Sequence, residues 1–542
     1  MAVIAIKTFG GISPKTPPRY LQDSQAQVAI NCPVFNGSLQ PLPNVGSTLY
    51  TLPKVGVPKT IYRFGQDLIS DTQYWFHWTT DVDVVRSQIP SDTSEWTFYT
   101  GDGAPKATYA ALALSGGSQE YPTVSRPLGI LAPETAATVD LVGDPTEATD
   151  LPETRVYTYT LVSKEAGFEA ESAPAPASFT IDVRLGQTVL VENFASIPSG
   201  YNITHRRIYR ATAGVFLFVA EIAVSATSYS DAILAEDLGE ELPSLTWLPP
   251  PATLKGLVNL PGGVIAGFTG RDIFFCDPYR PYAWPVQYQQ SVDFPVVGLG
   301  RTDTTLVVLT TGTPYFIQGS APDSMTVVKS DLEQACASKR SVVSTNGAVI
   351  YASPDGLVML APGGSRILTE QLFTRAQWQT LKPESIHAYA QDLKYVAFYD
   401  TGTTQGGFIY DLTSGQFVLH DIYATAGYAD LVNDKLFTAF ADRTIKAWQA
   451  GAAKSYVWRS KKFTLPKVTS FAAVQIEAEA YPVTLKVYAD DSATPLLSRV
   501  VTSREPFKLP VRMARDWEFQ VEADKEVFSI AMGQSELELA NV

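Results

Sequence analysis

The sequence has few of the residues that build redox and metal sites. It contains three cysteines, Cys32, Cys276 and Cys336, and four histidines among 542 residues. The cysteines form no C-x-x-C pair, and no histidine lies close in sequence to a pair of them. This spacing argues against a disulfide framework and against a zinc site. We therefore expect no bound metal and no cofactor.

Charged residues are also scarce, at 18% of the chain, and the net charge of −14 argues against a general nucleic-acid-binding face. The negative excess is uneven, because residues 128–250 hold 17 Asp and Glu against 6 Lys and Arg. The chain has no long apolar run, so no segment is expected to span a membrane. Its start, MAVIAIKTFGG, lacks the basic and apolar regions of a signal peptide.

Catalytic motifs are missing as well. No H-E-x-x-H, G-x-S-x-G, phosphate-binding loop or dinucleotide-binding fingerprint occurs, and we expect no catalytic residue. His77, within YWFHWTT, is predicted to pack in a strand. The turn SPDG at 353–356 resembles a sialidase repeat turn, but it occurs once and an Asp-Gly hairpin explains it. The acidic stretch 144–155 lacks the spacing of a calcium loop and is interpreted as a solvated loop.

Turn residues and aromatic residues are abundant. The chain has 37 Gly, 37 Pro, 26 Tyr, 26 Phe and 9 Trp, a composition that favours β structure with many turns. Paired apolar segments turn near residues 270, 312, 355, 404 and 442. These intervals of roughly 40–50 residues are typical of four-stranded propeller blades. The sequence therefore predicts an all-β protein with a β-propeller of about six blades, and a series of β-sandwiches is the alternative.

The pattern predicts five segments. Residues 1–55 form an extended arm with a short helix at 21–29 and a hairpin at Asn36-Gly37, and residues 56–127 form the first blade or blades. Residues 128–250 form an inserted sandwich of the fibronectin-III or immunoglobulin type, bounded by proline-rich stretches. Residues 251–451 form the remaining blades, and residues 452–542 form a C-terminal β-sandwich.

The segment FFCDPYRPYAWP, at 274–285, concentrates chemically distinctive residues at the end of a hairpin. Its three prolines prevent regular strand pairing and stiffen the chain. Tyr279, Tyr282 and Trp284 are predicted to bury their rings between blades. Asp277 and Arg280 are predicted to pair with each other or to satisfy nearby carbonyl groups. The segment is therefore interpreted as a structural joint.

This segment resembles a loop usually written FSEPYRPHAWP in the tail nozzle, or tail tubular, proteins of short-tailed (podovirus-like) bacteriophages. The start FGGISPKTPPRYLQDSQAQVAINCPVFNGSLQPL and the segment RRIYRATAG are also similar to that family, and the resemblance extends over residues 1–465. It implies a structural virion protein in the phage tail, assembled in the bacterial cytoplasm. Such subunits form a homo-oligomeric ring, expected to be a hexamer, around a DNA-ejection channel. The implied partners are a tail adaptor ring and tail fibres or other tail proteins.

The loop departs from the family pattern at Cys276, Asp277 and Tyr282, where Ser, Glu and His are usual, which argues against a fixed chemical role. DNA is expected to pass without tight binding. Affinity for DNA comes largely from cations that neutralise phosphates and release counterions, and an acidic channel wall has few such cations. Residues 7–30, with Pro14 and Arg19, and the insertion are predicted assembly surfaces, since a proline-rich arm has few internal contacts. Another tail hub or adhesin component and a carbohydrate-acting propeller hydrolase remain as alternatives.

Overall fold

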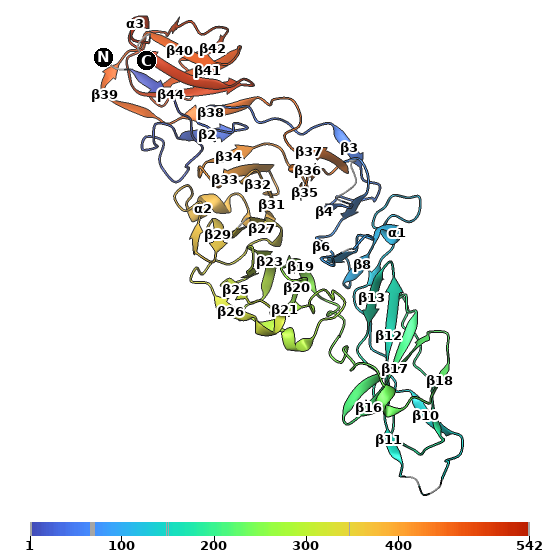
Figure 1. Cartoon of the computed structure of the whole chain (residues 1–542). Coiled ribbons are helices and arrows are strands. Elements are labelled where there is room, and N and C mark those ends of the chain that lie inside the picture. The colour runs from blue at the N-terminus through green and yellow to red at the C-terminus, as the bar shows by residue number, and fades with distance from the viewer. Residues whose placement is uncertain are drawn as a thin grey trace.

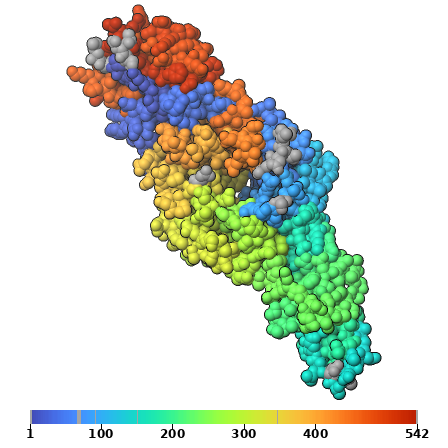
Figure 2. Space-filling view, in the orientation of Figure 1, coloured from blue at the N-terminus to red at the C-terminus, as the bar shows by residue number. Residues whose placement is uncertain are grey.

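A computed structural model describes residues 3–65, 71–90, 92–147, 149, 151–345 and 347–539. The molecule is elongated, with a ring of small β-sheets between two β-sandwiches (Figure 1). The inserted sandwich forms one end of the molecule and the C-terminal sandwich forms the other (Figures 1 and 2). The three α-helices of the described residues have four or five residues each, and none is long and apolar enough to cross a membrane. They are α1 (Ala110–Ala113), α2 (Arg375–Gln379) and α3 (Glu536–Leu539).

The central ring consists of separate antiparallel sheets in chain order. One sheet precedes the insertion: β6 (Asp83–Arg86), β7 (Thr97–Thr100), β8 (Lys106–Thr108) and β9 (Arg126–Pro127). Three sheets follow the insertion. The first has β19 (Lys255–Leu260), β20 (Val264–Thr269), β21 (Asp272–Phe275) and β22 (Gln290–Ser291), and the second has β23 (Val296–Arg301), β24 (Leu306–Thr310), β25 (Tyr315–Gln318) and β26 (Thr326–Lys329). The third has β27 (Val343–Thr345), β28 (Ala348–Ala352), β29 (Leu357–Ala361) and β30 (Gly364–Ile367). Each is a four-stranded blade, and the first strands of neighbouring blades pack side by side.

The next blade is β31 (His387–Gln391), β32 (Lys394–Asp400), β33 (Gln405–Asp411) and β34 (Phe417–His420). The last consists of β35 (Ala426–Asp430), β36 (Lys435–Ala439) and β37 (Thr444–Ala447), completed by the early strand β3 (Thr48–Thr51). The blade strands β24 and β28 read LVVLT and AVIYA and are buried along their whole length. Burial is continuous rather than alternating because each blade is stacked between two others, so both faces of its strands are covered.

Strands β4 (Thr60–Arg63) and β5 (Trp75–Trp78) form a two-stranded sheet in the same ring. It packs beside β35 on one side, and on the other its Phe76 and Trp78 share a cluster with Tyr99 of β7. The all-β fold with propeller blades is confirmed. The number of blades stays a prediction, because residues 66–70, between β4 and β5, lie outside the described residues.

The insertion is a β-sandwich of two main sheets and one strand pair. The first sheet has β13 (Phe168–Glu171), β12 (Tyr157–Glu165), β16 (His205–Thr212) and β17 (Val215–Ala223). The second has β10 (Thr138–Val142), β15 (Thr188–Glu192) and β18 (Ser228–Asp231), and β11 (Glu153–Arg155) pairs with β14 (Ile181–Val183). Tyr157 and Tyr159 of the first sheet and Val189 of the second are fully buried in one core, which is the arrangement expected of a sandwich.

The C-terminal sandwich also has two sheets, and the N-terminal arm contributes to both. Its strands are β38 (Tyr456–Ser460), β39 (Phe463–Thr469), β40 (Ala473–Ala478), β41 (Val483–Ala489), β42 (Leu497–Val501), β43 (Phe507–Lys508), β44 (Ala514–Ala523) and β45 (Val527–Gly533). The early strand β1 (Ile4–Ile6) pairs antiparallel with β45. The early strand β2 (Ala26–Ile30) lies between β34 of the propeller and β38 of the sandwich, so these strands share one ten-stranded sheet.

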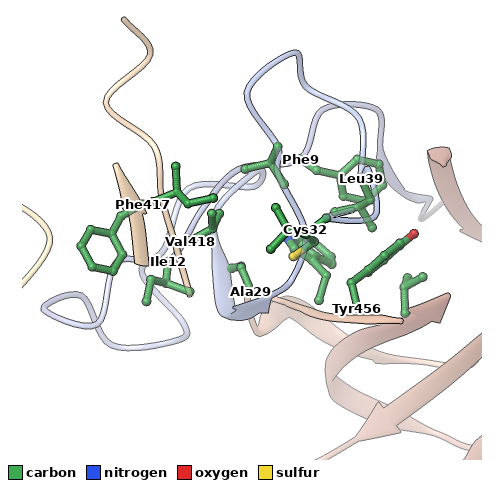
Figure 3. Close-up of a cluster of buried hydrophobic side chains, with 14 of the residues drawn as sticks. Phe9, Ile12, Ala29, Cys32, Leu39, Phe417, Val418 and Tyr456 are labelled. Carbon is green, nitrogen blue, oxygen red and sulfur yellow. The ribbon is translucent and has the colours of Figure 1, made fainter. Parts of the chain in front are cut away.

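The predicted helix at 21–29 is wrong, because β2 occupies its second half. Strand pairing on both edges of β2, with β34 and β38, outweighs the local helix preference of Gln and Ala. The residues around β2 are buried at this joint. Phe9, Ile12, Ala29 and Cys32 lie in one cluster with Phe417, Val418 and Tyr456 from the later part of the chain (Figure 3).

Candidate functional site at the joints and the axis of the propeller

The segment 274–285 forms a closed loop after β21. Its ends are tied by the backbone hydrogen bond from Asp277 N to Ala283 O, at 2.8 Å. The predicted pairing of Asp277 with Arg280 is confirmed, since Arg280 Nη1 lies 2.6 Å from Asp277 Oδ2. Asp277 also accepts a hydrogen bond from the hydroxyl of Tyr288, at 3.2 Å. Both carboxylate oxygens of Asp277 therefore accept hydrogen bonds that stabilise the loop.

The three aromatic rings of the loop point in different directions. Trp284 is buried between the blade β6–β9 and the blade β19–β22, as predicted, and its indole Nε1 donates to Pro281 O at 2.8 Å. The same prediction is wrong for Tyr282, which packs in the core of the inserted sandwich. It is also wrong for Tyr279, which is 47% exposed and lies on the surface against Gly263. Sequence spacing could not show that the insertion lies beside this loop.

The loop is thus the joint between the propeller and the inserted sandwich. The ring of Tyr282 contacts Phe168 of β13 and Trp247, with centroid distances of 5.6 and 5.8 Å. The guanidinium of Arg280 lies 4.7 Å from the centroid of Trp247, a cation–π contact. The backbone of Trp284 donates to Leu248 O at 2.8 Å. Arg280 therefore contacts the exit of the insertion as well as Asp277.

Close backbone packing fixes the entry of the insertion at the same place. Gly129 has φ +81°, and a Cβ there would lie 2.8 Å from Pro249 Cα and from Tyr282 O. Three segments of the chain therefore meet at this glycine without room for a side chain. The sequence reasoning missed both Gly129 and Trp247. The prolines beside them, in RPLG and TWLPPP, were interpreted only as boundaries.

The second joint is the N-terminal arm, and the expectation that it has few internal contacts is wrong. The carbonyl of Pro14 accepts a hydrogen bond from Gln377 Nε2 at 2.8 Å. Arg19, whose side chain is 50% exposed, pairs with Asp516 at 3.3 Å. The indole of Trp458 donates to Gly10 O at 3.0 Å. The arm lies on its own chain because β34 and β38 each have an edge that needs a partner strand.

A cavity of about 640 Å³ opens at one face of the propeller, where first and second strands of several blades are joined. Its wall includes the charged side chains Arg301, Asp303, Asp392, Lys394, Asp430, Asp434 and Lys435. Acids and bases are nearly balanced, and several are paired: Lys394 with Asp392, and Lys435 with Asp71 at 2.8 Å. The cavity is polar and charge-compensated.

The most buried carboxylate of this cavity, Asp430, is held by its neighbours. It forms an ion pair with the buried guanidinium of Arg63, which also lies 3.4 Å from Asp71. Burial raises the pKa of Asp430, but hydrogen bonds from Asn433 and Arg63 outweigh it and lower the pKa overall. An ionised, paired carboxylate cannot donate a proton. Asp430 is therefore unsuited to general acid catalysis of glycoside cleavage.

Three of the four histidines are buried. His77 lies in β5, as predicted, and burial lowers its pKa to about 4. Burial also lowers the pKa of His420 to about 4 and that of His387 well below its usual value. All three rings are neutral at physiological pH, and those of His387 and His420 pack against aromatic residues. Burial raises the pKa of the Cys276 thiol to about 12, so this loop cysteine is unreactive.

No group of three or more His, Cys, Asp or Glu side chains that could hold a metal occurs among the residues that the structure describes. The SPDG turn is occupied by structural contacts: Ser353 Oγ bonds to Gly356 O at 3.0 Å, and Asp355 pairs with Arg375 at 3.1 Å. These contacts stabilise the turn, and they account for Ser353 and Asp355 without a catalytic role.

No family model and no curated protein matches the chain. Solved structures similar to it include BBS1N in complex with ARL6DN (9% identity, 48% of this chain and 86% of that chain, TM-score 0.24). A second is an exo-β-1,3-galactanase from Phanerochaete chrysosporium (9% identity, 70% of this chain and 100% of that chain, TM-score 0.21). A third is the CNH domain of AfRom2 (7% identity, 70% of this chain and 98% of that chain, TM-score 0.27). At these TM-scores the likenesses carry no argument about function.

Proposed function

We propose that this protein is a structural virion subunit that forms the tail nozzle ring of a short-tailed phage. The observation that supports the proposal best is the way that the chain joins its three β units. The arm continues a propeller blade into the C-terminal sandwich, and the 274–285 loop clamps the inserted sandwich to the other side. An elongated body with two reinforced joints suits a subunit that has to withstand mechanical force during DNA ejection.

The side-chain chemistry is consistent with a structural role. The buried histidines are neutral, the loop cysteine is unreactive, and the carboxylate Asp430 is locked by Arg63. The net charge of −14 would let DNA pass through the ring without being trapped, because each phosphate neutralised by a cation would add affinity. In this proposal the ring is a hexamer that contacts an adaptor ring and tail fibres or other tail proteins.

The two alternatives make different predictions about the same molecule. A carbohydrate-acting hydrolase needs two carboxylates with separated pKa values facing the substrate, whereas Asp430 is paired and Asp392 lies beside Lys394. A hub or adhesin component would share the joints described above. It would bind a glycan or another tail protein without forming a ring alone.

Electron microscopy of the purified protein in negative stain, with light scattering after size-exclusion chromatography, tests the proposal. We expect closed rings of one size, with a central opening wide enough for a DNA duplex. A protein that remains monomeric at tens of micromolar, alone and with the other tail proteins of its phage, would contradict a nozzle. Release of reducing sugars from a polysaccharide panel would favour the hydrolase.

A further inference from the structure

The free end of the inserted sandwich carries exposed apolar side chains. We define the distal patch as Val142, Leu151 and Leu185 together with the exposed carboxylates Asp144 and Glu147. Leu151 is 93% exposed, Leu185 is 66% exposed and Val142 is 46% exposed. A group of exposed apolar side chains marks a candidate protein–protein contact, because covering it removes apolar surface from water.

The strand register brings these residues together. Strand β11 pairs with β14 so that Glu153 lies opposite Val183, and continuing this register places Leu151 opposite Leu185. The backbone of Thr146 donates to Leu185 O at 2.7 Å, which holds the acidic loop against the same position. Val142, at the end of β10, lies opposite Thr188 on the neighbouring strand. Strands β10 and β14 also pack beside each other, so the patch lies at the tip of the inserted sandwich, at the lower end of the molecule in Figure 1.

The C-terminal sandwich, at the opposite end, carries a second exposed apolar group. We define the basal patch as Val468, Val511 and Met513 together with the exposed cations Lys467 and Arg512. Val511 is 91% exposed, Met513 is 60% exposed and Val468 is 54% exposed. Strand β39 pairs antiparallel with β44 so that Thr469 lies opposite Ala514. Val468 and Met513 each adjoin this pair, one on either strand, so they are diagonal neighbours at the edge of the sheet.

The two patches have opposite charge. Residues 138–155 contain five Asp and Glu and one Arg, whereas residues 497–515 contain five Arg and Lys and one Glu. Neither Lys467 nor Arg512 has an ion pair among the described residues, and the same holds for Asp144 and Glu147. Two surfaces with apolar centres and opposite charges satisfy the requirements of one interface.

We propose that the distal patch of one copy of this protein binds the basal patch of another copy. The patches belong to opposite ends of an elongated molecule, so they do not meet within one chain (Figures 1 and 2). Contact between two different surfaces is heterologous, and it repeats from copy to copy into a closed ring or an open chain. The inference does not rest on the proposed function, because any role of the protein leaves the two patches complementary.

Charge exchange tests the interface directly. The distal variant is Asp144→Lys with Glu147→Lys, and the basal variant is Lys467→Glu with Arg512→Glu. Each variant alone places like charges at the contact, and we expect its self-association to weaken at least tenfold in sedimentation velocity. An equimolar mixture of the two variants restores opposite charges at every contact, and we expect it to associate as the wild type does.

A matched control changes the same charges elsewhere. Asp331→Lys with Glu333→Lys alters two exposed carboxylates of the propeller, and it should associate as the wild type does. The proposal fails if the wild-type protein does not self-associate, if either reversed variant associates normally, or if mixing the two restores nothing. Circular dichroism of each variant separates loss of the contact from loss of the fold, because these side chains are exposed.

Discussion

Replacing Phe9 by Ala tests whether the N-terminal arm is an internal joint of the molecule. The ring of Phe9 is 1% exposed and meets the indole of Trp458 edge to face, with a centroid distance of 4.9 Å. Truncating a buried phenylalanine costs about 3–5 kcal/mol. Loss of the aromatic pair adds about 1 kcal/mol. We therefore expect a decrease of about 4–6 kcal/mol in the free energy of unfolding of the joint.

The assay is urea unfolding followed by tryptophan fluorescence, since Trp458 lies at the contact (Figure 3 shows the same cluster). Limited trypsin digestion should show faster cleavage after Lys15 and Arg19 in the variant, because an arm that detaches from the rest of the chain becomes accessible to the protease. The control is Tyr20→Ala in the same arm, where the side chain is 74% exposed. That change should alter stability by no more than about 0.5 kcal/mol.

Two results would refute this reasoning. Equal urea midpoints for Phe9→Ala and Tyr20→Ala would mean that the arm does not support its own chain. A Phe9→Ala protein with normal stability but fewer oligomers would mean that the arm lies on a neighbouring copy. Deletion of residues 1–30 cannot distinguish these cases, because it removes both β1 and β2 from their sheets.

Three further predictions concern a histidine, a glycine and an ion pair. His420 has a pKa of about 4 in the folded protein and about 6.5 when unfolded, so the unfolded state binds the proton first as pH falls, and stability is lost between these values. In the wild type the free energy of unfolding should fall between pH 7.5 and pH 5, and urea unfolding should show that this fall is about 2 kcal/mol smaller in His420→Leu. An equal fall in the two proteins would contradict the prediction. Gly129→Ala should lower the melting temperature more than Gly214→Ala, because both have positive φ but only Gly129 lacks space for a Cβ; equal shifts would argue against the tight joint. Arg63→Met should cost about 3–5 kcal/mol in thermal unfolding by leaving Asp430 buried and unpaired. Arg375→Met, at an exposed pair, should cost less than about 1 kcal/mol, and similar costs would contradict the prediction.

Sequence patterns predicted the fold class because they are local. Alternating and apolar segments such as LVVLT in β24 identify strands, and Gly-rich or Asp-rich turns mark the ends of hairpins. The prolines of 274–285 indicated a joint between two blades, and Trp284 does lie between two blades. Of the two roles predicted for Asp277 and Arg280, the ion pair is the one observed.

What could not be predicted depends on pairing between distant segments. The sequence AQVAI of β2 gives no sign that its partners are β34 and β38, about 390 and 430 residues later. Likewise, Tyr282 was expected between blades, but the insertion lies nearby and provides a core for its ring. The Arg63–Asp430 pair was missed because its members lie on strands 367 positions apart.

The long-range pairing of the arm has a consequence for the order of synthesis. Strands β1, β2 and β3 are among the first made, yet their partners β45, β38 and β37 are among the last. At roughly 5–20 residues per second, β1 waits about 25–100 s for β45 to leave the ribosome. During that time the early strands have unpaired edges, which favour aggregation or capture by chaperones. A ribosome that stops before residue 456 leaves β1 without β45 and β2 without β38, so truncated products keep unpaired strand edges and should be easy for the cell to recognise and remove.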